Sequence, residues 1–255
     1  MEDASHAVEA SEDPQVPPPT IRALQNGPYL VEGNLRMVWK APVRTVLGEP
    51  VAWRTVTEIS HPTPCVLCRC GGSANKPFCD GTHARKGFDG TDAAEGRSRS
   101  ERAKTYQGDG IVVYDDRSIC THAGFCGTAV TNVWKMMAAT GDTNVRVQVT
   151  GMVERCPSGA LSYALTVDRD GVGDDAGEDI GDTVDIEPDL PAQIAVTPDG
   201  PLWVTGGVSI QASSGDRLEA RNRVTLCRCG ASASKPLCDG SHKKVGFAHA
   251  PPSGA

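Results

Sequence analysis

Two segments of the 255-residue chain each place three thiols and one imidazole within about sixteen residues, at the same spacing in both. The first set is Cys68, Cys70, Cys79 and His83, and the second set is Cys227, Cys229, Cys238 and His242. Thiolate and imidazole groups together bind soft or borderline metals or iron–sulfur clusters. Because the spacing is repeated, we expect both sets to be ligands of the same kind of metal centre.

The spacing inside each set suggests two pairs of ligands. A single residue separates Cys68 from Cys70, so both thiolates can chelate one metal atom. Cys79 and His83 are four residues apart, which puts them on the same face of a helical turn. Two pairs, each suited to one iron, describe a [2Fe–2S] site.

Polar neighbours of the ligands are expected to assist a cluster whose charge changes. Ser73 and Ser232 occupy equivalent positions and are predicted to donate hydrogen bonds to it. Four basic residues beside the ligands are predicted to stabilise the negative charge that reduction adds, because opposite charges attract: Arg69, Lys76, Arg228 and Lys235. Asp80 is expected to cap the ligand turn, its carboxylate accepting backbone N–H groups.

Both segments resemble the CDGSH iron–sulfur family, since each satisfies the pattern C-x-C-x2-S/T-x3-P-x-C-D-G-S/T/A-H. The resemblance implies a [2Fe–2S] cluster in each segment, with Cys68 and Cys70 on one iron. Cys79 and His83 would hold the other iron, and the second segment would divide its ligands in the same way. The resemblance also implies that two such units pair through a β-rich cap, here within one monomeric chain. A zinc site of three cysteines and one histidine is the alternative, although zinc sites more often use C-x2-C or wider spacing.

The repeat extends beyond the ligands. A Gly-Pro turn and a short run of strand-forming residues precede each ligand segment, at 26–33 and at 199–206. After the histidines, Lys86–Phe88 matches Val245–Phe247. Each module is therefore predicted to be a small β-rich unit that ends in a ligand loop and a short helical turn.

A third group of cysteines lies between the two modules. Five residues separate Cys120 from Cys126, and Cys156 is followed by Pro157. This part resembles single-cluster bacterial ferredoxins, and in particular a divergent ferredoxin domain that accompanies CDGSH modules in bacterial proteins. Ala123 stands where the ferredoxin pattern has a further cysteine.

Three thiols suit a [3Fe–4S] cluster, which is the predicted cofactor of the middle part. A [4Fe–4S] cluster with a non-cysteine ligand is the alternative, and His122 is the nearest candidate; three buried thiols without a cluster are the third interpretation. A strand is predicted at 111–114 and helices at 131–139 and 144–155. The second helix should end before Pro157, because proline disfavours helix in the preceding residue.

The predicted fold class is α+β, with two CDGSH modules forming an intrachain pseudo-dimer and a small α+β ferredoxin-like domain between them. The predicted parts are a disordered N-terminus at 1–19, the first CDGSH module at 20–90, a linker at 91–110, the ferredoxin-like domain at 111–167, an acidic linker at 168–190 and the second CDGSH module at 191–250. Cys65 is expected to be a buried thiol outside the ligand set, and His249 to be exposed without a partner.

Composition narrows the function classes. A net charge of -7 argues against binding of nucleic acid, which needs a concentrated basic face. Ten cysteines, mostly in ligand spacing and without a signal peptide, predict a reducing, cytoplasmic location rather than a disulfide scaffold. No apolar run approaches the ~20 residues that a membrane span needs, so no membrane association is expected.

The sequence therefore predicts an electron-transfer protein with two [2Fe–2S] clusters and one ferredoxin-like cluster. Its partners are expected to be redox proteins, and nothing in the sequence resembles the substrate site of an enzyme. The alternative function is transfer of clusters or iron to acceptor proteins, or redox sensing. It is motivated by His83 and His242, because protonation of either imidazole would remove a ligand.

Overall fold

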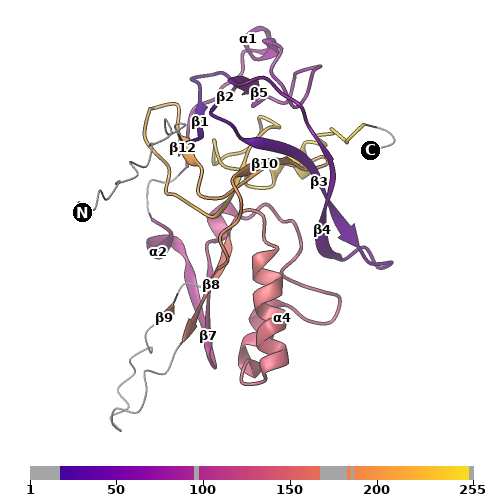
Figure 1. Ribbon diagram of the computed structural model, residues 1–255, viewed down its shortest axis with the longest axis vertical. Coiled ribbons are helices and arrows are strands. Elements are labelled where there is room, and N and C mark those ends of the chain that lie inside the picture. Colours follow the sequence, from indigo (N-terminus) through magenta and orange to yellow (C-terminus); the bar gives the residue numbers. More distant parts are fainter. Residues whose placement is uncertain (1–17, 95–97, 167–182, 185–186, 253–255) are drawn as a thin grey trace, which may run out of the picture.

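The computed structural model describes residues 18–94, 98–166, 183–184 and 187–252. The two ends of the chain build one interlocked β structure, and the middle builds a separate sheet with a helix beside it (Figure 1). These two parts lie toward opposite ends of the long axis of the molecule. The predicted disordered N-terminus lies almost wholly outside the described residues, as does most of the predicted acidic linker.

The interlocked part consists of a first module, with elements between residues 20 and 86, and a second module, with elements between residues 193 and 244. The first module contains β1 (Thr20–Ala23), β2 (Tyr29–Glu32), β3 (Arg36–Arg44), β4 (Pro50–Glu58), β5 (Cys65–Leu67) and the short helix α1 (Thr82–Lys86). The second module contains β10 (Gln193–Val196), β11 (Leu202–Thr205), β12 (Ser209–Gln211), β13 (Arg223–Leu226) and the short helix α5 (Ser241–Lys244).

The two modules exchange strands. The strand orders are β12-β1-β2-β5 in one sheet and β13-β11-β10-β3-β4 in the other, with β12 parallel to β1 and β3 parallel to β10. Since β3 and β12 are the third strands of their own modules, the exchange is reciprocal. An isolated β-bridge between Cys70 and Cys229 joins the two ligand loops. The predicted intrachain pseudo-dimer is therefore confirmed.

One hydrophobic core serves both modules. β2 buries alternate residues, whereas β10, β11 and β13 bury every residue, because their sheet is covered on both faces. One face meets the shared core, which includes Cys65 as predicted, and the other carries Val38, Ala195 and Trp203 with Trp53 packed against them. A fully buried aliphatic side chain contributes about 1.5–3 kcal/mol, so the modules stabilise each other through this core.

The middle module is an antiparallel sheet with helices on one side. Its strands, in the order β6-β7-β8-β9, are β6 (Lys104–Gly108), β7 (Ile111–Asp115), β8 (Leu161–Thr166) and β9 (Thr183–Val184). Its helical elements are η1 (Arg117–Ile119), α3 (Val133–Met136), η2 (Met137–Ala139) and α4 (Thr143–Glu154). The predicted strand at 111–114 and both predicted helices are thus confirmed, the first helix being α3 continued by η2.

Three further elements lie in the two segments predicted to be linkers. Helix α2 (Arg99–Arg102) and strand β6 both fall within 91–110, and β9 falls within the predicted acidic linker. β6 is an edge strand without a fully buried side chain, so its sequence has no apolar pattern from which a strand could be predicted.

Helix α4 begins at a capping aspartate and buries one of its faces. The side chain of Asp142 accepts a hydrogen bond from the backbone N–H of Asn144 at 2.7 Å and caps the helix. Val149, Met152 and Val153 form its buried face.

Among the described residues, no helix combines the length and the apolar character needed to cross a bilayer.

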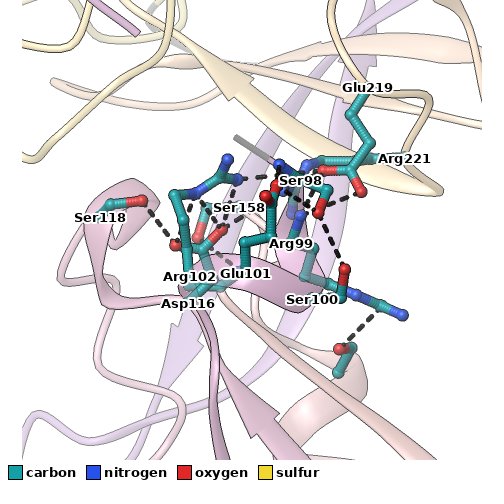
Figure 2. Close-up of polar contacts among 12 residues, drawn as sticks. Ser98, Arg99, Ser100, Glu101, Arg102, Asp116, Ser118, Ser158, Glu219 and Arg221 are labelled. Atoms are coloured by element: carbon teal, nitrogen blue, oxygen red, sulfur yellow. Dashed lines mark hydrogen bonds and ion pairs between the residues drawn. The ribbon is translucent and has the colours of Figure 1, made fainter. Parts of the chain in front are cut away.

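A polar network joins the middle module to the second module, as Figure 2 shows. The carboxylate of Asp116, only 1% exposed, accepts hydrogen bonds from Arg102 of α2 at 2.8 Å and from Arg221 at 3.3 Å. Arg221 also donates to Glu219 at 2.7 Å. Burial raises the pKa of Asp116, but the bonds from Arg102 and Ser118 and the two arginine charges outweigh it, so this pKa lies below its ordinary value.

Candidate metal centres

In the first module the ligand residues form two close pairs. The sulfurs of Cys68 and Cys70, which directly follow β5, are 3.9 Å apart. The sulfur of Cys79 lies 3.2 Å from Nδ1 of His83, the second residue of α1. The strand end thus supplies one pair, and the helical turn supplies the other.

The second module repeats this geometry. The sulfurs of Cys227 and Cys229 are 3.7 Å apart, immediately after β13. The sulfur of Cys238 lies 3.3 Å from Nδ1 of His242 in α5. All eight predicted ligands of the two modules are therefore brought together as two pairs in each.

These distances suit two metal atoms in each module. A tetrahedral metal with metal–sulfur bonds of about 2.3 Å holds two thiolates about 3.8 Å apart, close to the separations in both C-x-C pairs. Each module therefore offers two close pairs of donors, as the two-iron centre predicted from the spacing requires.

Burial keeps most of these thiols protonated unless a cation is near. It raises the pKa of Cys68 and Cys79, and it raises that of Cys238 to about 12. In the remaining pair, the hydrogen bond between the thiols lowers the pKa of Cys227 to about 6 and raises that of Cys229. Such a pair loses its first proton readily and its second with difficulty, so only a bound cation makes both thiolates favourable.

An aspartate shapes each ligand turn. The carboxylate of Asp80 accepts hydrogen bonds from the backbone of Thr82 at 3.0 Å and of Ala74 at 2.8 Å, and Asp239 makes the equivalent bonds. The bonds from Thr82, then that from Ala74, hold the pKa of Asp80 below its ordinary value. The N-cap of α1 is Gly81, which makes no side-chain capping bond, so the prediction that Asp80 caps the turn was wrong by one residue. Asp80 instead ties the turn to the loop after the C-x-C pair.

The serines and lysines predicted to neighbour the clusters make hydrogen bonds within their own loops. The hydroxyl of Ser73 donates to the carbonyl of Phe78 at 2.7 Å, and the ammonium of Lys76 donates to the carbonyl of Ser73 at 2.5 Å. Ser232 and Lys235 make the equivalent contacts in the second module. The bonds fix the shape of each loop, and a direct contact of these groups with a cluster stays a prediction.

Two buried arginines have partners that sequence reasoning did not find. Arg69 and Arg228, the central residues of the C-x-C pairs, are 1% and 2% exposed. Arg228 donates to the carbonyls of Gly200 at 2.7 Å and Thr197 at 2.6 Å, and it also contacts Nδ1 of His249. The prediction that His249 is exposed without a partner was wrong. Burial, with the charge of Arg228, lowers the pKa of His249 to about 4, so the ring is neutral and can accept this bond.

Tyr29 of the first module reaches the ligand loop of the second. Its buried hydroxyl lies 2.8 Å from the carbonyl oxygen of Cys227 and 2.9 Å from that of Pro236. Burial raises the pKa of this phenol well above its ordinary value, so it remains a hydrogen-bond donor. The second module has Leu202 at the equivalent position, so this link is one-sided.

The three cysteines of the middle module line one cavity. Cys120, Cys126 and Cys156 surround a hollow of about 180 Å³, and the guanidinium of Arg117 lies 3.9 Å from the sulfur of Cys120. Burial, followed by the charges of Cys156 and Cys120, raises the pKa of Cys126, so the three thiols interact electrostatically. His122 lines the same cavity. Three thiolates around one hollow suit a cluster in which each thiolate binds a different iron.

Comparison with known protein families gives two matches that cover these sites. Residues 26–84 and 199–243 match the family described as iron-binding zinc finger CDGSH type, and residues 106–166 match the family described as divergent 4Fe-4S mono-cluster. No curated protein and no solved structure shows a significant match to the chain. The matched segments contain all eleven predicted metal ligands. The chain is therefore an iron–sulfur protein in which two CDGSH modules flank a divergent single-cluster module of the 4Fe-4S type.

Proposed function

We propose that the protein is an electron carrier that takes electrons from one redox protein and passes them to another. The observation that supports this most is the presence of two paired ligand sets and a third cysteine-lined cavity in one small fold. When bound, iron–sulfur clusters supply one-electron chemistry. A carrier with several such sites needs no substrate pocket, so we class the protein with carriers rather than enzymes and expect it to act in the cytoplasm.

The residues that would hold the two CDGSH clusters form two equivalent sets, each with a C-x-C pair on one iron and a Cys–His pair on the other. They are Cys68, Cys70, Cys79 and His83 in the first module and Cys227, Cys229, Cys238 and His242 in the second. The C-x-C thiols of the first module are 2% and 3% exposed, so the chain keeps water away from that pair. A buried site limits hydrolysis of a cluster and keeps its surroundings fixed when its charge changes.

In the middle module, Cys120, Cys126 and Cys156 would hold the cluster. Three thiols support a [3Fe–4S] cluster, whereas the family match and the place of His122 beside the cavity support a [4Fe–4S] cluster with histidine as the fourth ligand. EPR of the oxidised protein separates the two, because an oxidised three-iron cluster is paramagnetic and the four-iron and two-iron clusters are silent. Loss of one iron in a His122→Ala variant would support the histidine ligand.

Cluster transfer is the second candidate function, and the exposure of one ligand favours it. His83 is only partly buried, so water can reach a ligand of the first module. If transfer is the function, an apo-acceptor protein should remove the cluster from the first module, and His83→Cys should slow the removal. An unchanged transfer rate in that variant would count against a role of the histidine.

Reversible reduction tests the electron-carrier proposal. Anaerobic protein mixed with a limiting one-electron reductant should change its visible spectrum, and admission of a mild oxidant should restore the original spectrum completely over repeated cycles. Irreversible bleaching in the first cycle would exclude a carrier role and leave cluster transfer as the better proposal.

A further inference from the structure

The ligand loop of the middle module lies against the histidine turn of the second module. The ammonium group of Lys243 donates a hydrogen bond to the carbonyl of His122, which stands between Cys120 and Cys126. A methyl group added to Gly240 would come within 2.8 Å of the ring of His122. The turn that carries His242 therefore lies directly against the loop that carries two of the middle thiols.

A second contact joins the same two sites. Arg223, the first residue of β13, donates hydrogen bonds to the carbonyls of Val153 at 2.6 Å and of Cys156 at 3.1 Å. β13 then runs directly into Cys227. One hydrogen bond and a short piece of buried strand thus connect a middle ligand to a ligand of the second module.

The first module lacks both contacts. Pro64 stands where the second module has Arg223, and Ala84 stands where it has Lys243. Gly81 has nearly the same left-handed backbone as Gly240, with φ of 82° against 86°, but a methyl group on it would meet nothing within 4 Å. Figure 1 shows α1 at the end of the molecule opposite to the middle module.

The two histidine ligands also differ in burial, because only one of them lies against the middle module. His242 is 6% exposed beneath the middle module, whereas His83 is partly exposed. The first site nevertheless adjoins the second, because Cys70 and Cys229 form a β-bridge. The three sites therefore lie in the order middle module, second module, first module.

We infer that electrons move along this order, so that the middle site and the ligand set of the first module exchange electrons only through the ligand set of the second module. The inference rests on the proposed carrier function. In each step the donating site loses one electron and the receiving site gains it, and no bond forms or breaks. A one-electron carrier protein supplies or accepts the electron. The contacts of Lys243, Gly240 and Arg223 keep the middle site close to the ligand set of the second module, so the electron crosses a short distance between them.

Midpoint potentials of the holoprotein test the order of the sites. Removal of the second cluster by Cys227→Ser should shift the midpoint potential of the middle site, because that site loses its charged neighbour, and removal of the first cluster by Cys68→Ser should leave it unchanged. Lys243→Ala should lower the potentials of the middle site and the second module but not that of the first, since one nearby positive charge is lost. Lys244→Ala is the matched control on the same turn. Equal shifts from Cys227→Ser and Cys68→Ser, or from Lys243→Ala and Lys244→Ala, would overturn the order.

The rate of internal electron transfer gives an independent test with a matched pair of glycines. After rapid one-electron reduction by pulse radiolysis, Gly240→Ala should slow equilibration between the middle site and the second module, because the added methyl group displaces His122. Gly81→Ala imposes the same backbone strain without a neighbour and should not slow it. Equal rates in the two variants would contradict the inferred path. Reversible cycling in every variant would show that the carrier function itself holds, so a failure of the order is distinguishable from a failure of the function.

Discussion

At the scale of single residues, the glycines after the C-x-C pairs decide how closely the two ligand loops can approach. Gly71 has φ of 75°, and a methyl group on it would lie 2.5 Å from the carbonyl oxygen of Cys229. Gly230 stands in the reciprocal place, where a methyl group would lie 2.7 Å from the carbonyl oxygen of Cys70. Backbone atoms cannot move aside as a flexible side chain can, so only glycine fits at either position.

Gly71→Ala should therefore destabilise the protein more than backbone strain alone would. Gly48 has a similar φ of 82° but open space around it, so Gly48→Ala isolates the strain, which costs about 1–2 kcal/mol. The clash at Gly71 should add about 1–3 kcal/mol and loosen both clusters. Denaturant unfolding followed by visible absorbance measures the difference, and equal free energies of unfolding for the two variants would exclude the close approach.

The grouping of the proposed ligands could be predicted from spacing, whereas the residues that support them could not. Cys68 and His83 belong to a short local pattern in which the chemistry is visible. Tyr29 and Arg228, by contrast, bind carbonyls from distant parts of the chain, and those contacts exist only after the modules have exchanged strands. The different residue at the equivalent position, Leu202 against Tyr29, was the one available signal of a one-sided role.

At the scale of elements, the hairpin of β3 and β4 connects the first module to the middle module. The indole N–H of Trp53 in β4 donates to the carbonyl of Arg155 at 3.0 Å, directly before Cys156. The indole ring packs against Phe125 at a centroid distance of 4.9 Å and against Trp203 at 5.0 Å. The hairpin therefore holds the loops of two of the three middle thiols.

Two substitutions at Trp53 separate the contribution of its hydrogen bond from that of its ring packing. Trp53→Phe keeps an aromatic ring but leaves the Arg155 carbonyl without its donor, so the free energy of unfolding should fall by about 1 kcal/mol. Trp53→Ala should lower it by about 3 kcal/mol and make the middle cluster more labile to oxygen. Val51→Ala, on an exposed side chain of the same strand, should change it by less than about 0.5 kcal/mol. Equal stability of the Trp53→Ala and Val51→Ala variants would show that the hairpin does not support the middle module.

The elements with buried apolar faces could be predicted from the sequence. Strand β7 and helix α4 show clear apolar patterns, and both were predicted within a residue or so of their ends. β6 pairs at the edge of its sheet and buries no side chain fully, so hydrogen bonding to β7 rather than its own pattern makes it a strand. Edge pairing of this kind depends on a neighbour that a local sequence pattern does not contain.

At the scale of the whole molecule, the network around Asp116 fixes the middle module against the second module. Removing one partner of a buried ion pair leaves an uncompensated charge, which costs about 3–5 kcal/mol. Asp116→Asn should cause a loss of this size, whereas Glu58→Gln should cost about 1 kcal/mol or less, because Glu58 pairs with Arg36 at the surface. Chemical unfolding at neutral pH measures both, and a loss no larger in Asp116→Asn than in Glu58→Gln would contradict the role of the network.

Asp116 should also make the free energy of unfolding depend on pH. The folded pKa of Asp116 is lowered, so its contribution to stability is fully present above the unfolded pKa of about 3.9 and is lost as the pH falls through the folded value. The difference in free energy of unfolding between the wild-type protein and Asp116→Asn should therefore be constant near neutral pH and shrink below about pH 4. Because the clusters are equally labile to acid in both proteins, the effect of that lability cancels when the two free energies of unfolding are subtracted at each pH. A difference independent of pH would contradict the lowered pKa.

The overall arrangement could be predicted only in part. Resemblance of the two repeats to paired CDGSH units predicted the pseudo-dimer, and the structure adds that the third strand of each module lies in the sheet of the other. The position of the middle module beside His242 rather than His83 could not be predicted from the repeats, since both ligand sets have the same spacing. It depends on Arg223 and Lys243, whose partners lie in the middle module.

An anaerobic redox titration monitored by EPR and by visible absorbance, with iron, zinc and sulfide content measured on the same sample, tests the central assignment most directly. The protein should contain iron and sulfide and little zinc, with roughly four of the iron atoms in two two-iron clusters. It should show reversible one-electron signals from both CDGSH modules and from the middle module. Colourless protein that contains zinc at the CDGSH sites, or no metal at all after anaerobic purification, would contradict it.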